Sequence, residues 1–346
     1  MRAVVVHGAE DVRIDHLPDP VPADGEVVVA MEWGGICGSD VGYWRHGGSG
    51  TAVLEHTMVL GHEVAGRVAG IGRGVAGIEI GTPVTVHPAE LVGSERLPAR
   101  IAGRTNLHPR VRYFGSAAFD PHTDGGFSEF RAVRAEQLRP LPAGVSTQQG
   151  ALAEPLAVAL HAVGRAGDLN GRTVLVNGAG PIGSLVVAAA KFRGAATVIA
   201  ADLSEPALRI AERLGADEVR ALGAGDSLPD DIELVFEASG APAALGPVLR
   251  ATARGGTLVQ VGNLPGTPAA AALGDLVTRE ITWIGSYRFV DEITDALEAL
   301  RDGLDIGPLI THTFDLDRAV DALAVAADRT SGSSKVLLRL DPESGI

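Results

Sequence analysis

The chain carries two different patterns of hydrophobic and polar positions. Over about the first 150 residues, short β-branched runs such as 27–30 and 84–86 are separated by Gly/Pro turns, a pattern typical of a β-rich unit. From about Glu154 onward, apolar strands alternate with amphipathic helices, which predicts a doubly wound parallel sheet. The expected fold class is therefore α/β, with a β-rich domain and a parallel-sheet domain.

The strands of the expected parallel sheet are short apolar runs between turn residues. They cover 173–177, 198–202, 234–238, 257–262 and 281–286, with helices in the intervals. Beyond residue 291 the pattern predicts a helix, a strand at 309–314, a helix near 317–327 and a closing strand at 335–340. The pattern alone allows this last stretch to extend the second domain or to return to the first.

Composition and charge narrow the class of protein. With 346 residues and 46% hydrophobic content, the chain can close two cores, which argues against a disordered or fibrous protein. The net charge of −14 argues against nucleic acid or an anionic membrane as a partner, because both need a basic surface. Since the apolar runs are short, we expect neither a signal peptide nor a membrane span. The single cysteine, Cys37, rules out an internal disulfide framework and favours a cytoplasmic location.

A glycine-rich turn follows the first strand of the expected parallel sheet. Gly178, Gly180 and Gly183 lie at the start of the apolar helix, with Pro181 and Ile182 between them. Glycines at this spacing allow a tight turn and the close approach of a pyrophosphate to the helix N-terminus. The segment is therefore a candidate dinucleotide site. The alternative is an ordinary strand-to-helix turn in an unrelated α/β protein.

An acidic residue further along supports the dinucleotide interpretation. Asp202 lies 24 residues after Gly178, at the end of the next strand, where a carboxylate can accept both ribose hydroxyls. A carboxylate there repels a 2′-phosphate, so NAD is favoured over NADP. Arg209 in the following helix would soften this preference, although a solvated helix residue is its simpler interpretation.

Three residues scattered along the chain have the chemistry of zinc ligands. Cys37, His62 and Glu154 offer a thiolate, an imidazole and a carboxylate, and a catalytic zinc ion takes three protein ligands and keeps one position open. Only the fold can bring them together, so spacing alone does not establish a site. Taken singly, Cys37 is more simply a small buried hydrophobe and His62 a satisfied core histidine.

The strings around these residues form a known pattern. The chain resembles the zinc-containing medium-chain dehydrogenases essentially from end to end, through Gly-Ile-Cys37-Gly-Ser39-Asp40, Gly61-His62-Glu63, Glu154-Pro155-Leu156 and Gly178-x-Gly180-x-x-Gly183. It is most similar to the sorbitol (polyol) dehydrogenase branch, which has Glu at the position of Glu154 where ethanol-type enzymes have Cys. Strings such as Tyr113-Phe-Gly-Ser-Ala and Val259-Gln-Val261-Gly262 make it closer still to L-idonate 5-dehydrogenases.

The resemblance implies a domain arrangement and a set of partners. A GroES-like catalytic domain is expected at 1–150 and 291–346, with a Rossmann domain at 151–290 inserted between its parts. Val261 and Gly262 are expected to contact the cofactor together with the glycine turn. The expected partners are a small polyol or sugar acid, such as L-idonate, and further copies of the chain in a homo-oligomer, a dimer or a tetramer.

The resemblance also implies a metal-assisted mechanism. Zinc would act as a Lewis acid that lowers the pKa of a substrate hydroxyl, so that hydride can leave for the nicotinamide. Cys37, His62 and Glu154 are the expected ligands, directly or through water. Glu63 is the further candidate, with a supporting carboxylate behind the ligands as its competing role. The resemblance does not separate Glu63 from Glu154 as the direct ligand.

Three more residues match family positions around the substrate. Ser39 is expected to pass the hydroxyl proton towards the nicotinamide ribose, with a turn-capping serine as the alternative. Tyr43 and Arg288 match positions that line the substrate pocket. Arg288 suits a substrate carboxylate, because a guanidinium binds it bidentately. The alternative for Arg288 is an ordinary surface ion pair.

Two departures from the family pattern change the expectations. Relatives often carry a structural zinc lobe with four cysteines, and the corresponding positions here are Ser94, Leu97, Arg100 and His108. A four-thiolate site cannot form, so one zinc ion per chain is expected. Gly42 stands where polyol dehydrogenases often have His, so any proton relay through that side chain is absent.

Two rival functions share the fold. A zinc-free quinone or enone reductase would keep the glycine turn but has no need of Cys37, His62 and Glu154 together. A non-catalytic NADH-binding protein would keep the fold without turnover, and metal analysis with an NAD-reduction assay separates it from an enzyme.

Overall fold

The computed structural model describes residues 1–223 and 225–341, and within it the chain forms two compact units. Unit 1 comprises Met1–Glu154 and Ile310–Ile346, and unit 2 comprises Pro155–Leu309. The expected second boundary at 290/291 lies earlier than this division, because helix α8 (Glu292–Arg301) pairs within unit 2 through His161–Glu292 and Arg193–Asp295. No helix in the described ranges is long and apolar enough to cross a membrane.

Unit 1 is rich in strands, as the short β-branched runs predict. Its strands are β1 (Arg2–Gly8), β2 (Asp11–His16), β3 (Glu26–Gly35), β4 (Gly48–Ser49), β5 (Ala52–Val53), β6 (Met58–Val59), β7 (Glu63–Ile71), β8 (Pro83–Val86), β9 (Ala89–Leu91), β10 (Val111–Tyr113), β11 (Phe130–Arg134), β12 (Leu138–Pro140), β19 (Ile310–Asp315) and β20 (Lys335–Arg339). Its helices are α1 (Gly38–His46), α2 (Thr147–Ala151) and α9 (Ala319–Ala327), while α3 (Ala153–Arg165) begins at its edge.

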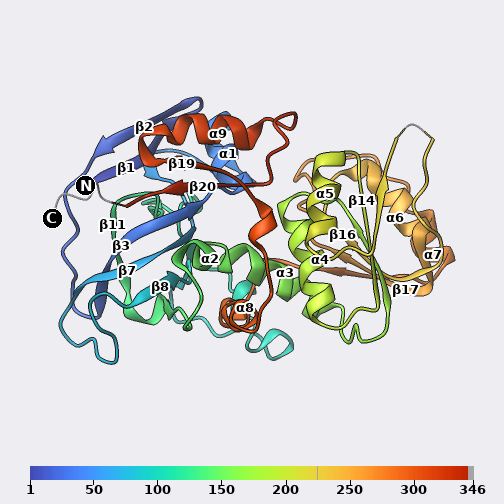
Figure 1. Ribbon diagram of the computed structural model, residues 1–346, viewed down its shortest axis with the longest axis horizontal. Coiled ribbons are helices and arrows are strands. Elements are labelled where there is room, and N and C mark those ends of the chain that lie inside the picture. Colours follow the sequence, from blue (N-terminus) through green and yellow to red (C-terminus); the bar gives the residue numbers. More distant parts are fainter. Residues whose placement is uncertain (224, 342–346) are drawn as a thin grey trace. The chain divides into compact units, whose positions relative to one another are not determined.

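The largest sheet of unit 1 joins the two ends of the chain. Its order is β12-β8-β7-β3-β20-β19, and β11 also pairs with β3. Strand β20, red in Figure 1, runs antiparallel to the blue strand β3, with Leu337 opposite Gly35. The C-terminal stretch therefore returns to the first domain from Ile310 onward, whereas its first part, with α8, extends the second domain.

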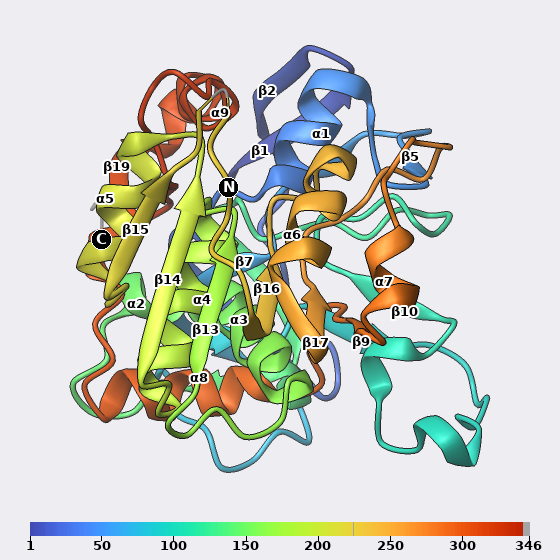
Figure 2. The same ribbon diagram turned by 90° about the vertical axis from the view of Figure 1, so that its right-hand side faces the viewer.

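Unit 2 is a parallel sheet with helices between its strands. The sheet order is β15-β14-β13-β16-β17-β18, and its central strands can be followed in Figure 2. The order reverses between β13 and β16, the position at which such sheets bind ligands. The strands are β13 (Thr173–Asn177), β14 (Thr197–Asp202), β15 (Glu218–Ala221), β16 (Ile232–Glu237), β17 (Thr252–Gln260) and β18 (Thr282–Gly285), and the remaining helices are α4 (Pro181–Phe192), α5 (Glu205–Arg213), α6 (Leu245–Ala251) and α7 (Gly274–Thr278).

Local sequence explains where these elements begin. Helix α4 starts with Pro181, whose missing N–H would have had no partner in the first turn anyway. Helix α5 is capped by Ser204, whose hydroxyl accepts from the Ala207 N–H. Strand β13 is apolar and buried at Val174, Leu175 and Val176, as a strand covered on both faces requires.

Candidate metal centre and dinucleotide site

Three potential metal ligands come together in unit 1. Ligand atoms of Cys37, His62 and Glu63 all lie within 4.8 Å of one another, and no other such group of three exists among the described residues. Because zinc binds thiolate, imidazole and carboxylate ligands at about 2.0–2.3 Å, one ion can contact all three. The donor set therefore fits a zinc ion.

Two neighbouring strands and a helix N-terminus position this cluster. Strand β3 ends at Gly35, which lies opposite Glu63 at the start of β7. Cys37 lies two residues further on, at the N-cap of helix α1, and its backbone N–H donates to the carboxylate of Asp40 at 2.9 Å. Asp40 also accepts from the backbone N–H of Gly61 at 3.1 Å, so one buried side chain ties both ligand-bearing loops together.

The electrostatics of the cluster favour a positive charge. Burial alone disfavours the imidazolium, but the Cys37 thiolate and nearby carboxylates outweigh it and raise the pKa of His62 to about 10. Burial also raises the pKa of Asp40. The anionic groups that favour a proton on His62 would equally favour a divalent cation.

Glu63 carries a partner that the sequence analysis missed. The buried Lys335 ammonium donates to Oε1 and Oε2 of Glu63 at 2.8 and 2.7 Å, and to the carbonyl oxygen of Ile36 at 3.2 Å. Burial disfavours the charged ammonium, but Glu63, Cys37 and Glu154 together outweigh this effect, so the pKa of Lys335 is raised. A lysine at the start of the apolar strand β20 was the only signal in the sequence that pointed to this ion pair.

Glu154 lies beside the cluster, outside the group of three. Its Oε1 accepts from the Tyr113 hydroxyl at 2.5 Å, and its side chain is buried. Burial raises the pKa of Glu154, and the charge of His62 opposes that shift. The structure thus brings all four sequence candidates into one neighbourhood, with Glu63 closest to the thiolate and imidazole set.

The remaining residues of unit 1 that the sequence analysis singled out, Ser39, Tyr43 and Gly42, lie in different surroundings. Ser39 is half-buried in the first turn of α1. Tyr43 is only 2% exposed and its oxygen accepts from the Ala117 N–H at 2.9 Å, so it packs in the core and its substrate contact stays a prediction. A Cβ added at Gly42 would lie 2.9 Å from the carbonyl oxygen of Gly48, so a histidine there would require a backbone shift.

The lobe between β9 and β10 is closed by a histidine. The His108 ring contacts the carbonyl oxygen of Glu95 through Nε2 at 3.1 Å, and its Nδ1 lies 3.1 Å from the backbone N–H of Arg110. Hydrogen bonds to the backbone thus link the two sides of the lobe at the position of one family cysteine.

The glycine turn of unit 2 has the geometry of a dinucleotide-binding loop. Gly178 has φ +94°, and an added Cβ there would lie 2.5 Å from the backbone nitrogen of Ser239. A Cβ on Gly183 would lie 1.7 Å from the carbonyl oxygen of Gly178, whereas one on Gly180 would meet open space. The first and last glycines are required by packing, and the middle one leaves room for an approaching pyrophosphate.

Asp202 is placed beside this turn. Its Oδ2 accepts from the Ala179 N–H at 2.6 Å and its Oδ1 from the Ser204 N–H at 2.8 Å. Each carboxylate oxygen keeps a second acceptor site, which a ribose hydroxyl can use. Arg209 is exposed and pairs with Glu205 at 3.7 Å, the interpretation favoured from the sequence.

The remaining candidates of unit 2 follow strands β17 and β18. The backbone N–H groups of Val261 and Gly262 both donate to the carbonyl oxygen of Glu237 at 2.8 Å. Arg288 has φ 50°, and its guanidinium lies 5.1 Å from the centre of the Tyr287 ring. Its contact with a substrate stays a prediction.

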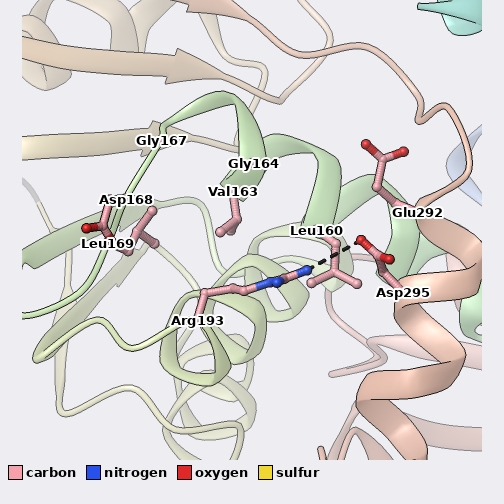
Figure 3. Close-up of a pocket in the computed structure, with 9 residues that line it drawn as sticks. All are labelled: Leu160, Val163, Gly164, Gly167, Asp168, Leu169, Arg193, Glu292 and Asp295. Carbon is pink, nitrogen blue, oxygen red and sulfur yellow. Dashed lines mark hydrogen bonds and ion pairs between the residues drawn. The ribbon is translucent and has the colours of Figure 1, made fainter. Parts of the chain in front are cut away.

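A separate cavity of about 300 Å³ occurs in unit 2. It is lined by the end of α3, by Asp168 and by Arg193, which pairs with Asp295 at 3.4 Å (Figure 3). The segment that contains Asp168 precedes β13, whereas the glycine turn follows that strand. The cavity therefore lies at the opposite end of β13 from the dinucleotide-binding loop, and it holds none of the expected site residues.

Two features define the class of protein. Unit 1 is a GroES-like domain with a zinc-type donor set, and unit 2 is a Rossmann domain with a three-glycine turn. Together they define a zinc-binding, dinucleotide-linked dehydrogenase. A family model described as zinc-binding dehydrogenase matches residues 181–302, and one described as alcohol dehydrogenase GroES-like domain matches residues 23–143. The chain belongs to the zinc-dependent medium-chain alcohol dehydrogenase family, which confirms the resemblance and the fold class.

Individual relatives match almost the whole chain. Sorbitol dehydrogenase of Gallus gallus is 36% identical, over 98% of this chain and 96% of the relative. L-idonate 5-dehydrogenase (NAD(P)(+)) of Escherichia coli K12 is 35% identical, over 90% of this chain and 91% of the relative.

Solved structures agree with this assignment. The crystal structure of Escherichia coli L-idonate 5-dehydrogenase matches with a TM-score of 0.91 and 34% identity, over 98% of this chain and 97% of that one. An Escherichia coli CFT073 alcohol dehydrogenase complexed with NADH matches with a TM-score of 0.87 and 28% identity, over 98% and 99% of the two chains. A Sinorhizobium meliloti protein bound to NADP has a TM-score of 0.87 and 30% identity, over 98% of each chain.

Proposed function

We propose that this protein transfers hydride from a secondary hydroxyl of a sugar acid or polyol to NAD, with L-idonate, oxidised to 5-keto-D-gluconate, as its substrate. The observation that carries the proposal is the convergence of Cys37, His62 and Glu63 in a chain whose other unit presents the glycine turn and Asp202. The similarity to both sorbitol and L-idonate enzymes supports a substrate with several hydroxyl groups.

The chain's own residues have distinct tasks in this proposal. Zinc, when bound, would supply a Lewis acid for the substrate hydroxyl. Cys37, His62 and Glu63 would hold it, because their ligand atoms form the cluster, with Glu154 as a ligand through water. Ser39 Oγ would accept the proton that the substrate hydroxyl releases and pass it on towards the ribose.

A substrate screen tests the proposal. NAD reduction would be measured with L-idonate, D-gluconate, sorbitol, xylitol and threonine, and the highest kcat/KM is expected for L-idonate. If sorbitol or xylitol is oxidised most efficiently, the protein is a neutral-polyol dehydrogenase, the second candidate, which its similarity to sorbitol dehydrogenases favours. Binding of NADH without turnover of any substrate would identify a non-catalytic relative.

Two further features belong to the proposal. One zinc ion per chain is proposed, because Ser94, Leu97 and Arg100 of the lobe are not zinc ligands. A homo-oligomer is also proposed, since strand β18 lies at the edge of its sheet, where a second copy can pair with it. Elemental analysis measures the zinc content per chain, and light scattering measures the oligomeric state.

Asp202 is expected to set the preference for NAD. Asp202→Ala should lower the ratio of kcat/KM for NAD to that for NADP by about tenfold or more, because hydrogen bonds to the ribose hydroxyls are lost and repulsion of the 2′-phosphate is relieved. Glu205→Ala, an exposed acid in the next helix, serves as the control and should leave the ratio unchanged. Equal efficiency with both cofactors in the unmodified protein would contradict this role.

Arg288 is expected to recognise the substrate carboxylate. A charge-assisted pair contributes about 1.5–3 kcal/mol, so Arg288→Ala should raise the KM for L-idonate by about tenfold or more. The KM for sorbitol, which has no carboxylate, is the internal control and should change less than about twofold. Equal loss with both substrates would assign Arg288 to the cofactor or the fold instead.

A further inference from the structure

A buried carboxylate at the end of strand β16 faces hydrogen-bond donors only. Glu237 is fully buried, and its Oε1 accepts from the Asn177 side-chain amide at 3.3 Å, the Ser239 N–H at 2.9 Å and the Ser239 hydroxyl. Its Oε2 accepts from the Gly240 N–H at 3.1 Å and from the Gln260 side-chain amide at 2.6 Å. All of these donors are neutral, and within the described ranges no cationic side chain forms a salt bridge with it.

These bonds connect the three loops that follow β13, β16 and β17, at the carboxyl-terminal ends of these parallel strands. Asn177 ends β13 just before the glycine turn, Ser239 and Gly240 follow β16, and Gln260 ends β17. The Gln260 amide also donates to the carbonyl oxygen of Gly262 at 2.8 Å, and so links Glu237 to the third loop. The loops are in close contact, because a Cβ on Gly262 would lie 2.3 Å from the backbone nitrogen of Gly240.

The position of Glu237 in the sheet suggests which half of the cofactor it serves. The glycine turn and Asp202 lie on the β13–β14 side, which binds the adenosine half of a dinucleotide. Glu237 lies across the point where the strand order reverses, on the β16–β17 side, where the nicotinamide half is bound. The loops after β16 and β17 therefore lie on the side of the nicotinamide half, while Asn177 joins Glu237 to the strand before the glycine turn.

We propose that Glu237 is a positioning residue that holds the loops after β16 and β17 in the shape required by the nicotinamide half of the cofactor. This inference rests on the proposed dinucleotide function. A carboxylate suits the task because both of its oxygens can accept, whereas the amide of a glutamine would turn a donor towards donors. The Gly240 N–H or the Gln260 amide would then lose its partner.

The test compares a ligand that occupies both halves with one that occupies the adenosine half alone. Dissociation constants for NADH and AMP would be measured by calorimetry for the unmodified protein and for Glu237→Gln. We expect the Kd for NADH to rise about tenfold, since a buried donor without a partner is costly, while the Kd for AMP changes less than about twofold. The KM for NAD should rise with it, while the KM for the polyol stays near its original value.

Glu233 provides a matched control on the same strand. It is exposed, and among residues 1–223 and 225–341 its side chain pairs only with Arg172 at 3.4 Å, so Glu233→Gln removes the same charge from β16 without touching the loops. This variant should bind NADH and AMP as the unmodified protein does. An equal loss of NADH affinity in Glu233→Gln would assign the effect to net charge and overturn the proposal.

A second variant keeps the proposal testable if Glu237→Gln does not fold. Gln260→Ala removes one of the links to Glu237 and should raise the Kd for NADH about threefold, with AMP unaffected. Unchanged NADH binding in both variants, or equal loss of NADH and AMP, would overturn the positioning role. Failure of the unmodified protein to bind NADH at all would instead refute the proposed function.

Discussion

Replacing Cys37 with alanine is expected to remove the bound zinc and to lower the rate of NAD reduction by at least about a thousandfold. Such a loss corresponds to about 4 kcal/mol of transition-state stabilisation, within the range that a Lewis acid supplies. Cys37 is the single cysteine in the chain, and the substitution removes only its sulfur atom. The backbone N–H of residue 37 still donates to Asp40, so the start of α1 is retained.

Two readouts other than activity accompany this variant. Elemental analysis should give about one zinc per chain for the unmodified protein and almost none for Cys37→Ala. NADH binding should change less than about twofold, because the glycine turn and Asp202 belong to the other unit. Ser94→Ala, at a lobe position where relatives have cysteine, is the control and should keep its zinc. A Cys37→Ala protein that still holds one zinc would contradict the assignment.

Lys335→Met is expected to lower the free energy of unfolding by about 3–5 kcal/mol. The Lys335 and Glu63 side chains are 3% and 1% exposed, so removal of the ammonium leaves a buried carboxylate without the counter-charge that donates to both of its oxygens. Glu63 also packs against Gly35, where an added Cβ would overlap its carboxylate. Urea unfolding of the two proteins without added metal measures the difference.

A double variant and a second lysine make this prediction specific. Glu63→Gln combined with Lys335→Met should recover at least about half of the lost stability, because the unpaired charge is gone. The chain has only one other lysine, Lys191, which pairs with Asp217 at 2.9 Å and is 30% exposed. Lys191→Met should cost less than about 1 kcal/mol, since exposed ion pairs contribute little. Equal losses in Lys191→Met and Lys335→Met would show that burial of the pair is not the cause.

Local pattern was sufficient where an element or a site depends on residues close together in the chain. The strand before Gly178 has the bounds that the pattern predicted, and the glycine pattern from Gly178 to Gly183 runs into the start of helix α4. Asp202 was also found from the sequence, because one strand and one helix separate it from the turn. Secondary structure follows the spacing of apolar residues, and this spacing is legible without knowledge of the rest of the fold.

Contacts between distant residues were decided by the tertiary structure alone. The α/β class, the glycine turn and the types of residue able to bind zinc could all be predicted from the chain's own residues. The sequence did not determine that the last strand pairs with β3, that Lys335 neutralises Glu63, or that Glu63 rather than Glu154 completes the group of three. The physical reason is that a charge or a ligand acts through distances in space, and packing of the whole sheet brings residues 37, 63 and 335 together. Periodicity reveals which face of a strand is buried, but it carries no information about which distant side chain will meet it.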